Sequence, residues 1–203
     1  MFTKTIRMTH YNTIEQEGFA EYKERGSKFL AYSFPFNDAQ KLKTIIQNLK
    51  KEHPKAVHFC FAYKIGIDGN KFRSSDDGEP SGSAGKPILG QIESKGLTDV
   101  LIVVVRYFGG TLLGVPGLIS AYKSAASMSL QVIPVIRKPI LAYLKIDVDF
   151  TKMNEILAIL KKYNCQIIDR ENSLFSSLSV GIPLEMKEEA LYNLSQIQNI
   201  NLY

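Results

Sequence analysis

The chain has 203 residues, of which 45% are hydrophobic and 22% charged, and its formal net charge is +5. This composition is ordinary for a soluble globular protein with room for two small domains, and the two cysteines, Cys60 and Cys165, are too few for a disulfide framework. The longest apolar run, 100–105, is too short to span a bilayer, and residues 1–7 lack the apolar core of a signal peptide, so we expect a cytoplasmic protein without a membrane partner.

The first elements predicted along the chain are a hairpin and a helix. Residues 18–36 alternate loosely between apolar and polar around Gly26, which is typical of two strands joined by a turn. Asp38 is placed to cap a helix that Pro54 ends. This helix would bury one apolar stripe, made of Leu42, Ile45, Ile46 and Leu49.

Two further strands and a helix that follows the second of them are predicted between residues 56 and 131. Residues 100–108 are apolar on both faces as far as Arg106, as expected of a strand that is covered on both sides. Residues 116–131 predict a helix whose small side chains permit close packing on a sheet. The other strand, 56–65, alternates: Val57, Phe59, Phe61, Tyr63 and Ile65 share one face, and His58, Cys60 and Ala62 share the other.

The segment 133–139 predicts a domain boundary. Pro134 and Pro139 follow a long helical pattern, and each proline disfavours helix at the residue before it. We therefore expect an N-terminal domain over residues 1–135 and a C-terminal domain over residues 136–203.

The second part of the chain predicts the order β-α-β-β-α. Alternation over 142–150 indicates a half-buried strand, and Thr151 is placed to cap the following helix. Strands are expected over 166–171 and 174–182, the second with Leu174 on its apolar face. A last helix and a short final strand would complete the ferredoxin-like plan, so the fold class is α+β. That helix carries Ala190, Leu191, Leu194 and Ile197, and the strand covers 200–203.

The positive charge is unevenly distributed. Residues 1–135 hold 17 Lys and Arg against 12 Asp and Glu, whereas residues 136–203 hold 8 of each sign. A basic domain beside a neutral one is compatible with nucleic-acid contact. The alternative is that a charge of this size only keeps the protein soluble.

The loop 74–87 is acidic and rich in turn residues. Its carboxylates Asp76, Asp77 and Glu79 suit a divalent cation or a general base, although the spacing matches neither an EF-hand nor a Walker A loop. An ordinary turn is the structural alternative, with Ser81 or Ser83 capping a helix that begins near Lys86.

The loop 106–117 is rich in glycine and lies between a buried strand and a helix. Backbone N–H groups in that position suit an anion, but the glycine spacing is not the dinucleotide fingerprint, and a tight turn explains it equally. Arg106 ends an apolar strand and should have a carboxylate partner, for which the acidic loop is the obvious source.

The sequence offers little for nucleophilic catalysis. His58 and Cys60 would share one strand face without an acid to orient the histidine, so a packed cysteine and a hydrogen-bonded histidine are the favoured interpretation. No Gly-x-Ser-x-Gly elbow and no His-x-x-x-His pair occur.

Several motifs together resemble the uncharacterised YigZ/IMPACT family in its bacterial two-domain form. They are Ser75–Gly85, Arg106–Gly110 with Leu113-Gly114, Ser27–Phe29 and His53-Pro54-x-Ala56-x-His58. Two positions depart from the family pattern. Ser83 stands where the family usually has threonine, and Ser120 stands where it tends to have arginine, which removes a positive charge near the second loop.

The resemblance implies a fold and a broad role. It implies an N-terminal βαβ-containing domain like one shared by a ribosomal protein and elongation factor G, and a C-terminal domain like the last domain of that factor. The bacterial members have no established biochemical activity, and the eukaryotic relatives regulate translation initiation through protein contacts. With the charge asymmetry, this favours a non-enzymatic, translation-linked regulator that binds RNA, the ribosome or a translation factor.

The hypothesis names a set of binding residues and requires no cofactor and no metal. Contact would centre on the basic residues Lys28, Lys86, Arg106 and Lys123, and the full candidate set adds His58, Tyr107, Gly109, Gly110 and Gly114. The enzymatic alternative is a hydrolase or phosphotransfer activity, in which Asp76, Asp77 and Glu79 act with the loop from Gly109 to Gly117. A pure protein-interaction module is the third possibility.

Overall fold

The computed structural model describes residues 8–172 and 176–203, which form a mixed α/β structure with three sheets and five α-helices. Its contacts divide the chain into two compact units. The larger unit is Tyr11–Lys138, and the smaller unit combines residues 8–10 with Pro139–Tyr203. The assignment of 1–135 and 136–203 as domains of the family type stays a prediction.

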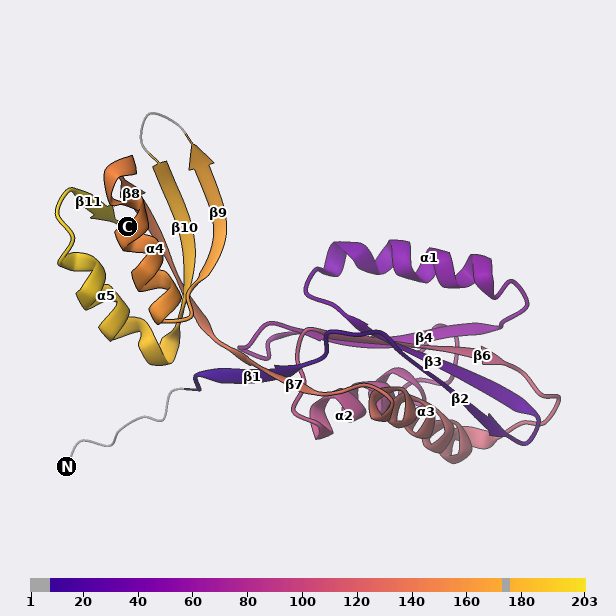
Figure 1. The fold of residues 1–203 in the computed structure, drawn as a ribbon. Coiled ribbons are helices and arrows are strands. Elements are labelled where there is room, and N and C mark those ends of the chain that lie inside the picture. The colour runs from indigo at the N-terminus through magenta and orange to yellow at the C-terminus, as the bar shows by residue number, and fades with distance from the viewer. Residues whose placement is uncertain (1–7, 173–175) are drawn as a thin grey trace, which may run out of the picture. The chain divides into compact units, whose positions relative to one another are not determined.

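The larger unit is built on a five-stranded sheet in which every neighbouring pair is antiparallel. Helix α1 covers one face of this sheet, and α2 and α3 cover the other (Figure 1). The strands, in spatial order, are β2 (Gly18–Glu24), β3 (Ser27–Pro35), β6 (Val100–Tyr107), β4 (His58–Ile65) and β5 (Lys71–Ser75). The helices are α1 (Leu42–Glu52), α2 (Gly85–Ser94) and α3 (Gly114–Gln131).

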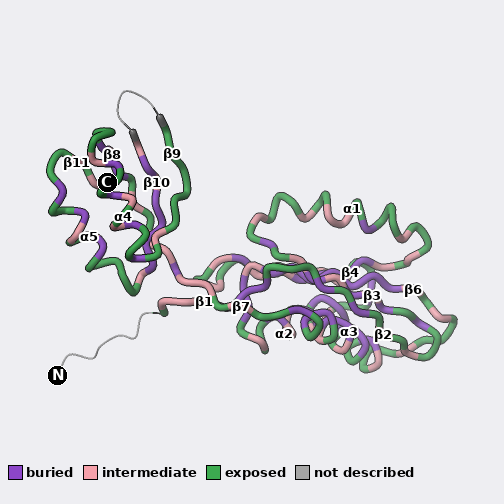
Figure 2. Tube along the Cα trace, in the orientation of Figure 1, coloured by how far each residue is buried: buried purple, intermediate pink, exposed green. Residues whose placement is uncertain are grey.

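Strand β6 lies at the centre of the sheet and is buried on both faces, as predicted from its continuous apolar run. Ile102 and Val104 pack with α2 and α3, whereas Val103 and Val105 pack on the side of α1. Figure 2 shows the resulting contrast between the buried strands of the sheet and the largely exposed outer helix α1. Arg106 lies near the C-terminal end of this strand and therefore at one end of the sheet.

The predicted hairpin and the predicted faces of β4 are confirmed. Strands β2 and β3 pair around a turn in which Gly26 has φ +80°. Phe59 and Phe61 point toward α1, and Cys60 and Ala62 point toward α2 and α3. The helix predicted after Asp38 is α1, and Asp38 caps the 3-10 turn Ala39–Lys41 that leads into it, accepting a bond from the backbone N–H of Gln40.

The smaller unit has a four-stranded antiparallel sheet with strand order β11-β8-β10-β9. Side chains from α4 and α5 form its core with those of the sheet. Its elements are β8 (Leu141–Val148), α4 (Met153–Lys162), β9 (Gln166–Asn172), β10 (Ser176–Pro183), α5 (Lys187–Ser195) and β11 (Ile200–Leu202). A separate two-stranded sheet pairs β1 (His10–Thr13) with β7 (Ile136–Pro139).

One predicted cap in the smaller unit is wrong. The side chain of Asp149, not that of Thr151, caps the 3-10 turn Phe150–Lys152 before α4, and it accepts bonds from both the N–H and the hydroxyl of Thr151 at 2.8 Å. An ionised carboxylate is the stronger acceptor for this purpose. The predicted position of Leu174 on a strand face lies outside the described residues.

No helix among residues 8–172 and 176–203 is both long and apolar enough to cross a membrane.

Candidate functional site

The acidic loop between β5 and α2 is held together by Asp76. Its carboxylate accepts bonds from the backbone N–H groups of Gly82 at 2.9 Å, Ala84 at 3.0 Å and Gly85 at 2.8 Å. Burial raises the pKa of Asp76, but these three bonds and the charge of Lys86 outweigh it, so that the pKa lies below its usual value. Asp76 therefore caps α2 from outside the helix.

The predicted cap of α2 by a serine is wrong. Ala84 occupies the N-cap position and makes no side-chain cap bond. The hydroxyl of Ser83 donates instead to the carbonyl of Pro80 at 2.6 Å, within the loop. Neither Ser81 nor Ser83 is needed as a cap, because the carboxylate of Asp76 already reaches the first N–H groups of the helix.

Asp77 ties the same loop to the start of β4. Its carboxylate accepts a bond from the backbone N–H of Phe59 at 2.7 Å. Its carbonyl accepts a bond from Nδ1 of His58 at 2.8 Å. Since a carbonyl can only accept, Nδ1 carries the proton, and the other ring nitrogen of His58 is directed toward Glu79, with 3.8 Å between Nε2 and Oε1.

Glu79 is the carboxylate partner of Arg106, as predicted. Its Oε1 lies 2.5 Å from Nη1 of Arg106 and accepts a bond from the hydroxyl of Tyr122 at 2.7 Å. The side chains of Arg106 and Glu79 are only 6% and 3% exposed. In a pair this deeply buried each charge compensates the other, and removing either residue would leave an uncompensated charge.

Cys60 belongs to the same buried cluster and is a packed thiol, as predicted. Its Sγ donates toward the carbonyl of Asp76 at 3.0 Å and lies 3.3 Å from the hydroxyl of Tyr122. Burial raises the pKa of the Cys60 thiol well above its usual value, and burial also raises the pKa of Tyr122. Both groups therefore remain protonated at neutral pH, which removes Cys60 as a nucleophile.

A pocket of about 430 Å³ opens beside this cluster, where β6 ends and α3 begins. His58, Glu79 and Arg106 contribute its polar groups, and Gly114 of the α3 N-terminus also lines it. The rest of the lining is apolar, and several of these side chains are exposed: Val57 51%, Phe108 49%, Leu112 83% and Val115 46%. We call these four side chains the pocket rim.

Arg106 has one hydrogen-bond donor that no described residue satisfies. Its Nη1 is bonded to Glu79, but its Nε is buried and without an acceptor among the described residues. The guanidinium carbon lies 5.4 Å from the ring centre of Phe29 and 5.7 Å from that of Phe108. Aromatic faces stabilise the charge but do not replace a hydrogen bond, and a buried unpaired donor costs about 1–3 kcal/mol.

The predicted binding residues do not all gather at this pocket. His58, Arg106 and Gly114 line it. Tyr107 faces the other side of the sheet, where its hydroxyl bonds to Nδ1 of His53, and Lys28 lies opposite Tyr107 in the strand register.

The remaining predicted residues lie elsewhere on the larger unit. Lys86 and Lys123 are exposed on α2 and α3. Gly109 packs against the turn of the β2–β3 hairpin, which favours the tight-turn interpretation at that position, whereas a Cβ at Gly110 would meet no atom within 4 Å.

The sequence motifs did not single out Tyr122 or the pocket rim as parts of the site. Tyr122 is the largest fully buried side chain, and it lies on a face of α3 that also holds Leu118 and several small residues. An aromatic residue in a helix this rich in alanine and serine is the pattern of a residue that fills a specific space. Leu112 and Leu113 are two leucines inside a glycine-rich loop, and apolar residues in such a loop are a recognisable indication of a binding surface.

The cation hypothesis finds no support in the geometry of the acidic loop. Asp76, Asp77 and Glu79 each engage a different protein partner. Within the part of the chain that the structure describes, no three His, Cys, Asp or Glu side chains lie close enough together to hold a metal ion.

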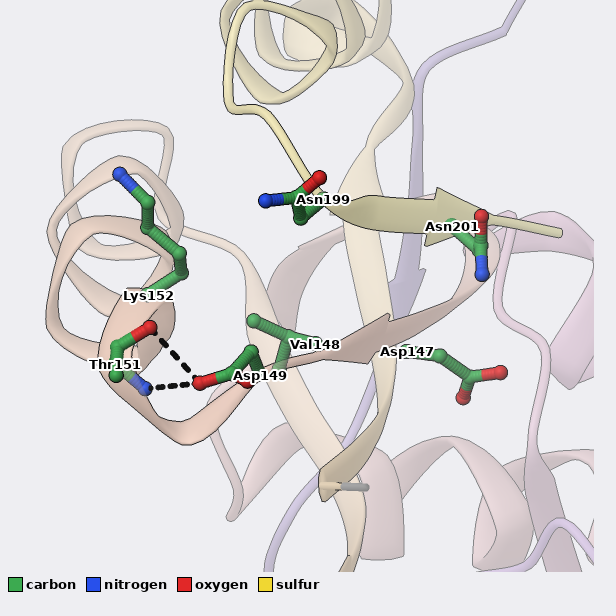
Figure 3. Close-up of a pocket in the computed structure, with 7 residues that line it drawn as sticks. All are labelled: Asp147, Val148, Asp149, Thr151, Lys152, Asn199 and Asn201. Atoms are coloured by element: carbon green, nitrogen blue, oxygen red, sulfur yellow. Dashed lines mark hydrogen bonds between the residues drawn. The ribbon is translucent and has the colours of Figure 1, made fainter.

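A second pocket, of about 420 Å³, lies in the smaller unit and is polar (Figure 3). Its lining includes Asp147, Lys152 and Asn201. Figure 3 shows Asp149 bonded twice to Thr151, and these bonds hold the pKa of Asp149 below its usual value. One of the two carboxylates in this pocket is thus already used as a helix cap, and we take the pocket of the larger unit as the candidate site.

The fold and this cluster of loops define a known class of protein. Residues 25–130 match the model of the Impact N-terminal domain, a segment that contains the acidic loop, the glycine-rich loop and most of α3. The chain belongs to the IMPACT family.

Similar proteins cover most of the chain. The IMPACT family member YigZ of Escherichia coli is 33% identical over 159 residues, which are 77% of this chain and 78% of YigZ. The IMPACT family member YvyE of Bacillus subtilis is 36% identical over 146 residues, which are 72% of this chain and 67% of YvyE. A solved structure described as that of a hypothetical protein aligns with a TM-score of 0.76 and 28% identity over 97% of both chains.

Proposed function

We propose that this protein is a non-enzymatic cytoplasmic regulator of translation, which binds a protein component of the translation machinery through the pocket rim. The observation that carries the proposal is the exposure of the rim, where Leu112 is 83% and Val57 is 51% exposed beside a pocket. Contiguous apolar groups of this kind are costly in water and typically mark an interaction site.

The chemistry of the cluster favours binding over the hydrolase or phosphotransfer alternative. A catalytic base or nucleophile must be free to take up a proton or attack a substrate. Asp76 and Asp77 are committed to backbone N–H groups, and Glu79 is committed to Arg106. The thiol of Cys60 is protonated and buried.

The link to translation rests on the family. Its support is the resemblance to eukaryotic relatives that regulate translation initiation through protein contacts. We also propose the ferredoxin-like plan for the smaller unit, supported by its element order and by its strand order β11-β8-β10-β9. The likeness of the larger unit to a domain of elongation factor G is a proposal of the same kind.

The test is co-sedimentation of the full chain with ribosomes over a series of salt concentrations. A contact through the pocket rim should persist as salt is raised, because burial of apolar surface does not depend on counterions. The variant Val115→Glu, which places a charge on the rim, should abolish the association.

A matched variant controls for the added charge. Val132→Glu places the same charge on a valine that is 61% exposed just after the C-terminal end of α3, and it should leave the association unchanged. Association that disappears with rising salt and that survives Val115→Glu would indicate contact with RNA phosphates instead, and would contradict the proposal.

A further inference from the structure

The pocket of the larger unit combines apolar walls with hydrogen-bond donors. Arg106 is 5% exposed, and no described residue accepts a bond from its Nε. Arg106 also lines the pocket. A buried donor of this kind is an observation that points to an acceptor supplied from outside the protein, because native structures rarely leave such groups unpaired.

The N-terminus of α3 supplies further donors at the same place. Gly114 begins this 18-residue helix and lines the pocket, and Leu113 at the N-cap makes no side-chain cap bond. Pro116 is the third helical residue and has no N–H, so the first turn offers the N–H groups of Gly114 and Val115. The N-terminus of a long helix favours an anion, since its partial charge is positive.

The acidic groups nearby do not oppose an anion. The charge of Glu79 is compensated by Nη1 of Arg106 and by the hydroxyl of Tyr122. His58 uses Nδ1 on the carbonyl of Asp77. Glu79 is therefore already paired within the protein, and the Nε of Arg106 and the start of α3 are donors without a partner side chain among the described residues.

We propose that this pocket binds a hydrophobic carboxylate, namely an apolar or aromatic group of about amino-acid size that carries one carboxylate. The apolar group would lie against rim residues such as Val57 and Val115, and the carboxylate would accept from Nε of Arg106 and from the first turn of α3. The ring of Phe108 is half exposed and lies against the guanidinium, so it would have to turn outward to admit the carboxylate. A volume of about 430 Å³ is within the range of small-ligand sites.

This inference deepens the proposed function, because it names the chemistry that the same pocket would recognise. A carboxylate beside an apolar side chain occurs both in a free acid and in the C-terminal residue of a protein. Both sources present the same two groups to the pocket, so the ligand chemistry is shared and the experiment must separate them.

The experiment is calorimetric titration of the full chain with N-acetylphenylalanine, its amide and N-acetylglycine. The acid should bind about tenfold more tightly than the amide, since a charge-assisted hydrogen bond to a buried group is lost in the amide. N-acetylglycine should bind more weakly than N-acetylphenylalanine, because it leaves the apolar walls uncovered. Equal binding of the acid and the amide, or no binding of the acid, would overturn the proposal.

Variants test where the acid binds without disturbing the buried ion pair. Val115→Glu on the rim should reduce the affinity for N-acetylphenylalanine at least about tenfold, because it adds a like charge beside the ligand. Val132→Glu, beyond the far end of the same helix, should leave that affinity unchanged. Binding that is unaffected by Val115→Glu would place the acid elsewhere and would overturn the site.

A pentapeptide that ends in phenylalanine, compared with its C-terminal amide, separates the two sources. A peptide acid that binds more tightly than N-acetylphenylalanine identifies protein C-termini as the ligand, and the reverse order identifies a free acid. If the acid does not bind but ribosome association remains and depends on the rim, this inference is wrong and the proposed function stands. If the acid binds but the protein does not associate with ribosomes, the proposed function is wrong and the ligand site stands.

Discussion

At the scale of single residues, three carboxylates that lie within four positions of one another perform three different tasks. Asp76 caps α2, Asp77 fixes the backbone of β4 at Phe59, and Glu79 neutralises Arg106. Each task needs an ionised oxygen at a different point, so the acidic loop joins the end of β5 to three other parts of the larger unit. The density of acidic residues is thus explained by structure before any ligand is considered.

The cap provided by Asp76 predicts a pH-dependent loss of stability. Asp76→Asn should lower the free energy of unfolding at pH 7 by about 1–2 kcal/mol, because an amide oxygen is a weaker acceptor for the N–H groups of Ala84 and Gly85. The pKa of Asp76 is lowered in the folded state. Its contribution is therefore fully present above the ordinary aspartate pKa of about 3.9 and is lost as pH falls through the lower folded value.

Urea denaturation at pH 7 and at about pH 3 measures this effect, since the ordinary aspartate pKa lies between the two. The difference between the wild type and Asp76→Asn should shrink at the lower pH. Glu93→Gln removes a charge from an exposed position on the same helix and should change stability little at either pH. A deficit of Asp76→Asn that stays constant from one pH to the other would contradict the role of the ionised cap.

At the scale of elements, the loop after β6 is positioned by its contact with the β2–β3 turn. A Cβ on Gly109 would lie 1.9 Å from the carbonyl carbon of Gly26 and 2.1 Å from the backbone nitrogen of Ser27. The N–H of Gly109 also donates to the hydroxyl of Ser27 at 3.2 Å. Because these are mostly backbone atoms, a side chain at Gly109 cannot be accommodated by a change of rotamer, and the hairpin turn helps to hold the loop.

Alanine substitutions at the two adjacent glycines should therefore differ. Gly109→Ala should destabilise the protein by about 3 kcal/mol, since the added methyl group overlaps with backbone. Gly110→Ala should cost only about 1–2 kcal/mol, because Gly110 has φ +84° but open space around it. Thermal unfolding of the two variants measures the difference. Equal losses would mean that the contact with the hairpin does not position this loop.

Some features of the helices, strands and caps could be predicted from the sequence, and others could not. Alternation placed β4 with the right faces, and the charge of Arg106 at the end of an apolar strand correctly implied a carboxylate partner in the acidic loop. The caps of α2 and α4 were assigned to the wrong residues, because proximity in sequence does not decide which oxygen reaches a helix end. Asp76 lies nine positions before Gly85, and only the folded loop brings its carboxylate to that N–H.

The apolar rim of the pocket could not be predicted from the sequence, for a related reason. His58, Arg106 and Gly114 were singled out as binding residues, and they do meet in one pocket. The exposure of Leu112 and Val115 could not be predicted, since it depends on how the loop before α3 leaves the sheet. Exposure of an apolar side chain depends on the tertiary structure. The periodicity of apolar residues predicts which side chains are buried only within helices and strands, and not in a loop.

At the scale of the whole molecule, the candidate site belongs entirely to one of the two compact units. Every residue that lines the pocket lies within Tyr11–Lys138, and so do the two hydrophobic cores on either face of the five-stranded sheet. The smaller unit has a core of its own, built by α4, α5 and its sheet. A unit that buries its own core has the main requirement for folding alone.

We therefore expect the fragment 11–138 to fold by itself and to keep the properties of the pocket. Its sheet and three helices are intact, so it should unfold in one cooperative thermal transition, as small single domains do. It should bind N-acetylphenylalanine with the affinity of the full chain and should sediment with ribosomes in the same rim-dependent way. A folded fragment that has lost both properties would show that the residues outside 11–138 contribute to the site, because the pocket lining itself is complete in the fragment. A fragment that does not fold would contradict the independence of the larger unit.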